Sequence, residues 1–91
     1  MSRIDILHPH GRSDQEARHI VEGIVDQLHQ RYGVAGDWGE DAVALSGPGL
    51  HGWIRLAPGQ VRVTADLGLL LSALHGPVEG EIRRVLGERL G

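Results

Sequence analysis

The chain has 91 residues, with nine arginines, no lysine and twelve carboxylates, which give a net charge of −3. Proteins that bind phosphate backbones carry an excess of basic residues, so no nucleic-acid partner is expected. The absence of cysteine excludes a disulfide framework and a thiolate zinc site. No apolar run is long enough to span a bilayer and the start lacks a secretory signal, which predicts one soluble, cytoplasmic domain over residues 1–91.

The first predicted elements are a strand over residues 2–7 and a long helix. Ile4 and Ile6 alternate with their neighbours, as in a half-buried strand. A capping box at residues 13–16 then predicts a helix start, and Gly33 predicts its end. Between them, apolar residues recur at spacings of three and four, which predicts one apolar helix face. They are Ala17, Ile20, Val21, Ile24, Val25, Leu28 and Tyr32.

Two histidines, His8 and His10, lie one residue apart between this strand and this helix. On an extended strand both imidazoles point the same way and could share a metal ion. A metal site also needs a third ligand, and Asp5 would lie on the opposite face of the strand from His8. We therefore interpret the segment as a strand end with Pro9 as its stop, and we expect no bound metal.

From residue 34 to residue 67 the hydrophobic period returns to two, and three glycine-containing turns predict three further strands in a meander. A turn at residues 57–60 sets the register of the last hairpin. On one face the predicted pairs are Arg55 with Arg62, Trp53 with Thr64 and His51 with Asp66, and on the inner face they are Leu56 with Val61, Ile54 with Val63 and Gly52 with Ala65.

The opposed arginines of this hairpin form the candidate ligand site. Like charges that face each other on a sheet repel, so either an anion binds between Arg55 and Arg62, or Asp5 or solvent screens them. We favour screening, because exposed charges cost little. Trp53 lies on the same face, which makes that face a candidate contact surface.

After residue 66 the spacing becomes helical and keeps one phase as far as Leu90, while Gly76 and Pro77 predict a kink or two helical pieces. The residues expected to face the core at its start are Leu67, Leu70, Leu71 and Leu74. Leu69 and Ala73 then form a second apolar stripe, which predicts self-association as a homodimer or docking to a partner.

The order strand, helix, three strands, helix predicts an α+β fold. We expect a two-layer sandwich in which two helices cover one face of a mostly antiparallel, four-stranded sheet. No serine lies in a nucleophile elbow, and the segment GPGLHG lacks the lysine and helix of a phosphate loop. We therefore expect no catalytic residue and no cofactor.

Three stretches resemble a known family: RIDILHPHGRSDQEAR, RYGVAGDW and GLHGWIRLAPGQVRVTADLGLLLSALHGPVEGEI. Nearly end to end, the chain resembles the polyhydroxyalkanoic acid system proteins, also called the granule-region family. These are small bacterial proteins encoded among genes for storage polyesters, some of them linked with the granule surface. The positions that resemble the family pattern include His10, Trp38, Gly52, Gly68 and Glu79, and the resemblance implies no catalytic residue.

This resemblance implies a non-enzymatic accessory or interaction protein of the polyhydroxyalkanoate system, in contact with the granule surface or with granule proteins. The alternative is a module that binds an acyl or hydroxyacyl ligand between the sheet and the C-terminal helix, and an enzyme of polyester metabolism ranks third. A pocket lined by Leu67, Leu71 and Trp38 would favour the ligand binder, whereas a filled core would favour the interaction protein.

Overall fold

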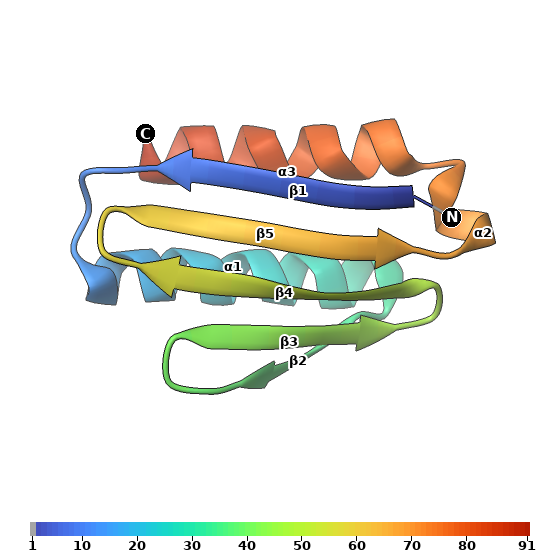
Figure 1. Cartoon of the computed structure of the whole chain (residues 1–91), viewed down its shortest axis with the longest axis horizontal. Helices are drawn as coiled ribbons and strands as arrows, with labels where there is room; N and C mark the ends of the chain where they lie inside the picture. The colour runs from blue at the N-terminus through green and yellow to red at the C-terminus, as the bar shows by residue number, and fades with distance from the viewer. Residues whose placement is uncertain (1) are drawn as a thin grey trace.

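The computed structural model describes residues 2–91, in which a five-stranded sheet packs against two long helices (Figure 1). The elements are β1 (Ser2–Pro9), α1 (Asp14–Tyr32), β2 (Ala35–Trp38), β3 (Ala42–Gly47), β4 (Leu50–Ala57), β5 (Gln60–Leu67), α2 (Leu69–Ser72) and α3 (His75–Leu90). All neighbouring strands are antiparallel, in the order β1-β5-β4-β3-β2. The predicted α+β fold is confirmed.

The sheet has one strand more than the sequence predicted, because the segment after α1 forms the separate edge strand β2. This strand has only four residues, and none of them is fully buried. So short and exposed a strand shows no clear alternation of apolar and polar residues. The element order is therefore strand, helix, four strands and two helices.

Helix α1 begins and ends where its capping signals predict. The Ser13 hydroxyl accepts a hydrogen bond from the Glu16 N–H at 3.2 Å, and the Glu16 carboxylate accepts one from the same hydroxyl at 3.2 Å. Gly33 ends the helix with φ 69°, a left-handed angle that glycine adopts without steric cost. The residues of α1 buried against the sheet are Ala17, Val21, Ile24, Val25 and Leu28.

The predicted register of the β4–β5 hairpin is also confirmed, because Ala57 pairs with Gln60 and Arg55 pairs with Arg62. Gly59 lies at φ 76°, the positive angle that this two-residue turn requires and that Pro58 cannot adopt. The same register places Trp53 beside Thr64 and away from the helices.

The segment after β5 differs from the prediction of one helical phase. Leu67 is the last residue of β5, and α2 is a single turn that ends before Ala73. The helix is in two pieces as predicted, but the break comes before Pro77. Pro77 lies in the first turn of α3, where the backbone N–H groups have no partner within the helix, so proline is tolerated there. Because residues 67–90 do not share one helix, the prediction that Leu70 and Leu74 face the core is wrong.

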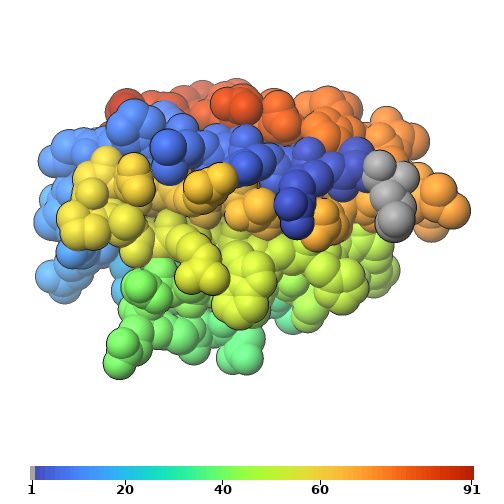
Figure 2. Space-filling view, viewed as in Figure 1, coloured from blue at the N-terminus to red at the C-terminus, as the bar shows by residue number. Residues whose placement is uncertain are grey.

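The core lies between the sheet and the two long helices. Alternate residues of the strands point toward it, and α3 covers them with one apolar face. The buried residues of α3 are Val78, Ile82, Val85, Leu86 and Leu90. Over residues 2–91, α1 and α3 both pack on this face, and Figure 2 shows the opposite face, on which strand side chains form the surface.

Candidate interaction surfaces

The open face of the sheet is the first candidate surface, and Trp53 stands near its centre on β4. Its side chain is 48% exposed, with Thr64 of β5 on one side and Ala44 of β3 on the other. The guanidinium of Arg55 lies over the Trp53 ring, 5.5 Å from the ring centroid. The sheet thus presents an aromatic side chain and a cation together, and tryptophan and arginine are both enriched among the residues that dominate binding at protein interfaces.

The two opposed arginines of this face have different partners. Arg62 donates two hydrogen bonds to the Asp5 carboxylate, at 3.2 and 3.0 Å, because β1 lies next to β5. These bonds hold the pKa of Asp5 below its ordinary value and raise the pKa of Arg62. Asp5 therefore screens the arginine pair, as the sequence interpretation favoured, and Arg55 forms no ion pair with any carboxylate of residues 2–91.

A shallow hollow surrounds Trp53 on the open face. Its volume is ≈ 340 Å³ and it opens broadly to solvent. Its lining residues are Arg3, His51, Gly52, Trp53, Arg55, Thr64 and Asp66. Arg3 and Asp66 form an ion pair across it at 3.0 Å. Such an open hollow suits a side chain of a protein partner better than a small molecule, which a binding pocket normally encloses.

The second candidate surface, here named the leucine end, consists of Leu69, Leu70, Ala73 and Leu74. The exposed fractions of the three leucines are 83%, 88% and 43%, and Ala73 is also exposed. Figure 1 shows α2 at one extreme of the long axis of the molecule. The predicted stripe of Leu69 and Ala73 is thus accessible, and the two leucines wrongly expected in the core enlarge it.

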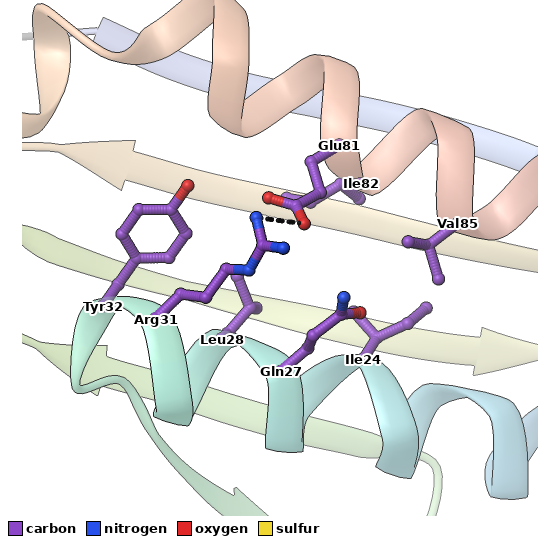
Figure 3. A pocket seen from close by; sticks show the side chains of 8 residues that line it. All are labelled: Ile24, Gln27, Leu28, Arg31, Tyr32, Glu81, Ile82 and Val85. Carbon is purple, nitrogen blue, oxygen red and sulfur yellow. Dashed lines mark ion pairs between the residues drawn. The ribbon is translucent and has the colours of Figure 1, made fainter.

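In the helix layer, a narrow groove lies between α1 and α3 (Figure 3). The side chains that line it are Ile24, Gln27, Leu28, Arg31, Tyr32, Glu81, Ile82 and Val85. An ion pair of 2.7 Å between Arg31 Nη1 and Glu81 Oε1 joins the two helices across it. The space inside is ≈ 10 Å³, about one water molecule and far less than an acyl chain needs.

The three residues proposed to line an acyl pocket do not form one. Trp38 lies on the edge strand β2, where the Arg18 guanidinium packs over its ring at 4.5 Å from the centroid. Leu67 is the last residue of β5 and pairs with Leu50, whereas Trp38 pairs with Val43 further along the strands, so the two residues do not lie beside each other across the sheet. Leu71 lies near the turn between β3 and β4. These positions do not support the ligand-binding alternative.

The histidine pair lies where β1 ends, with His8 in the strand and His10 just after it. Nδ1 of His10 accepts a hydrogen bond from the Arg12 N–H at 3.0 Å, and the His10 N–H donates to the Gly59 carbonyl at 2.8 Å. His8 lies on the last part of β1, opposite Val61. No group of three or more potential metal ligands occurs in the part of the chain that the structure describes. The expectation that no metal binds remains a prediction.

The positions that resemble the family pattern are spread over the fold rather than gathered in one site. Gly52 has no room for a side chain, because a Cβ atom there would collide with the Thr64 carbonyl oxygen of β5. Gly68 donates a hydrogen bond to the Gly49 carbonyl at 2.7 Å and joins α2 to the β3–β4 turn. Glu79 accepts one hydrogen bond from Arg83 Nε and pairs with His75, and these contacts lower the pKa of its carboxyl.

Comparison with known proteins gives one match. A family model described as "Putative polyhydroxyalkanoic acid system protein" matches residues 4–90. No curated protein and no solved structure matches the chain. Within residues 2–91, no helix has the length and apolarity that a membrane crossing requires.

Proposed function

Because the chain belongs to the polyhydroxyalkanoic acid system protein family over residues 4–90, we propose that it is a non-enzymatic accessory protein of the storage-polyester system. It acts in the cytoplasm at the polyester granule and binds other granule proteins. The observation that carries this proposal is the open sheet face, where a half-exposed Trp53 stands beside the unpaired cation of Arg55.

Two properties of the open face support protein binding. An antiparallel sheet can leave one face in water, but solvated positions then carry polar side chains rather than tryptophan. Tryptophan and arginine are also the residues that most often dominate binding energy at interfaces. A partner that covers Trp53 would bury an aromatic side chain at little entropic cost, since Arg55 and Thr64 already border its ring.

The interior favours this proposal over an acyl-binding module. Core side chains fill the space between the sheet and α3, and the groove between the helices holds about one water molecule. An acyl chain would require α1 and α3 to separate and the ion pair between Arg31 and Glu81 to break. The proposal assigns no catalytic residue and no cofactor.

The homodimer expected through Leu69 and Ala73 has less support. A stable interface buries about 20 to 30 residues on each side, whereas the leucine end comprises one turn of helix and two flanking residues. A homodimer therefore remains a proposal without an assigned interface, and sedimentation velocity at micromolar concentration measures it directly.

Native granules test the protein-binding proposal. Granules isolated from polyester-producing cells, with their surface proteins in place, should retain the purified chain. Trp53→Ala should weaken this binding about tenfold or more, as loss of an interface anchor does. The matched control is Arg83→Ala, which removes an equally exposed side chain from the helix layer. Equal binding by wild type and Trp53→Ala would show that the open face is not the contact.

Native mass spectrometry separates the proposal from its alternative. The chain is produced together with an active polyester pathway and transferred to the gas phase without denaturation. We expect the mass of the chain without a small ligand. A retained acyl or hydroxyacyl group would favour the ligand-binding module instead.

A further inference from the structure

The leucine end adjoins a second uncharged segment, and Arg3 and Asp66, which lie at the same end of the sheet, are paired with each other at 3.0 Å. The chain has no carboxylate and no arginine from residue 42 to 54, nor from 67 to 78. The hydrogen bond from the Gly68 N–H to the Gly49 carbonyl, 2.7 Å long, joins these two segments at one end of the sheet. Leu71 fills the space next to Gly49. The result is one neutral end built from α2 and the β3–β4 turn.

The two ends of the long axis differ in chemistry. At the end opposite α2, the turn between β2 and β3 contains Glu40 and Asp41, and the start of α1 contains Arg12, Asp14 and Glu16 (Figure 1). At the neutral end, Leu69 and Leu70 are more exposed than any other large apolar residue of the described chain. The molecule is therefore amphipathic from end to end, in addition to the amphipathicity of its helices.

The shape of the neutral end restricts what can cover it. The one-turn helix α2 lies at the extreme of the long axis, and its Leu69 and Leu70 are 83% and 88% exposed, so they form a projecting tip rather than a groove. A rigid protein partner would need a hollow that matches the two leucines, whereas a deformable apolar material, such as a lipid layer or an amorphous polyester, can surround them without one. Binding to an anionic phospholipid surface is strengthened by unpaired arginine or lysine beside the leucines. Residues 67–78 contain neither, and Arg3, at the same end of the sheet, is already paired with Asp66 at 3.0 Å.

We infer that the neutral end inserts Leu69 and Leu70 into the apolar, uncharged surface of the polyester itself. The inference rests on the proposed function, since it names the granule component that the chain contacts directly. Insertion removes two exposed leucines from water and requires no charge to be desolvated. The open sheet face then remains accessible to other granule proteins, because α2 lies at the end of the sheet and not over that face.

The test uses protein-free particles of amorphous polyhydroxyalkanoate and compares three chains by co-sedimentation. Wild type should bind the particles, and a Leu69→Glu, Leu70→Glu double variant should lose about tenfold or more in affinity. Leu7→Glu is the matched control, because Leu7 is an exposed leucine of the open face, and it should bind like wild type. Circular dichroism and thermal melting verify that all three chains are folded.

Vesicles distinguish the polyester from a membrane. Neutral phosphatidylcholine vesicles and vesicles that also contain phosphatidylglycerol should bind wild type more weakly than the polyester does. Tighter binding to the anionic vesicles, or equal polyester binding by the wild type and the double variant, would overturn the inference. Failure of wild type to bind bare particles while it still binds native granules would also overturn it, and would leave the protein-binding proposal intact.

Discussion

The two faces of the sheet differ although the same five strands build both. On the closed face the side chains of Ile4, Ile54 and Val63 are at most 1% exposed, because α1 and α3 cover them. On the open face their chain neighbours Asp5 and Trp53 are exposed, and ion pairs replace hydrophobic packing. Stability therefore depends on the closed face, and the open face is free to carry side chains for interaction.

The largest predicted effect is that of Gly52→Ala on the closed face. The new Cβ would lie 2.7 Å from the Ala65 Cα and closer still to the Thr64 carbonyl oxygen. Both are backbone atoms, so relief requires β4 and β5 to separate, and we expect a loss of about 4 kcal/mol, above the usual cost of overpacking. Urea unfolding measures it.

Gly80→Ala provides the glycine control on α3. No atom lies within 4 Å of a Cβ at this position, so alanine should raise the free energy of unfolding by up to about 1 kcal/mol. A Gly52→Ala protein as stable as wild type would contradict the close strand contact.

Two adjacent residues of β4 compare the faces directly. Ile54 is 1% exposed, and Ile54→Ala should lower the free energy of unfolding by about 3 kcal/mol through lost burial and a cavity. Trp53→Ala should lower it by less than about 1 kcal/mol, since it removes a half-exposed side chain and one cation–π contact. If both variants lost equal stability, the open face would not be energetically independent of the core.

A third test weakens the helix that covers the closed face. Ser13→Ala removes the hydroxyl that accepts the Glu16 N–H, and the loss of this cap should cost about 1 kcal/mol. Thermal melting detects it. Ser46→Ala, on the exposed side of β3, is the control and should change stability by less than about 0.5 kcal/mol.

A smaller effect concerns pH and the open face. Arg62 holds the pKa of Asp5 below its ordinary value of 3.8, so the folded state binds this proton less readily than the unfolded chain. The resulting stabilisation is complete above that value and is lost as pH falls through the lower pKa of the folded state. The free energies of unfolding of wild type and Asp5→Asn, measured as a function of pH by urea unfolding followed by circular dichroism, should differ above about pH 4 and converge at lower pH. Identical curves would mean that the ion pair is not formed in solution.

The last test has an expected effect of zero. Zinc or nickel added to tag-free protein should not change the melting temperature, because His8 and His10 lack a third ligand in the described residues. Metal analysis should likewise find no stoichiometric ion. Stoichiometric metal that disappears in His10→Ala would show that the turn at the end of β1 is a metal site.

Sequence reasoning succeeded where a signal is local. The caps of α1 and the register of the β4–β5 hairpin involve residues within a few positions of each other, and both were predicted correctly. The same register correctly predicted that Trp53, Arg55 and Arg62 share one face.

The errors came from short elements, whereas the distant pairing of Asp5 was only one of the open alternatives. The edge strand Ala35–Trp38 is too short to show a period, and the leucines after residue 67 fit a helical phase although a strand ends there. The ion pair of Asp5 with Arg62 depends on β1 lying beside β5, and periodicity does not specify strand order. The exposure of Leu70 could have been suspected from Gly68, which separates the strand from α2.

The position of β1 in the sheet also has a consequence for folding kinetics. The turns between β2, β3, β4 and β5 are short, so these hairpins close early and at low entropic cost. β1 instead pairs with β5, and Arg62 and Asp5 are 57 positions apart in the sequence. During synthesis β1 leaves the ribosome long before its partner strand exists, and until it docks, β5 remains an unpaired edge. We expect β1 docking to be the slow step, and the interval before it to be the period of greatest susceptibility to aggregation.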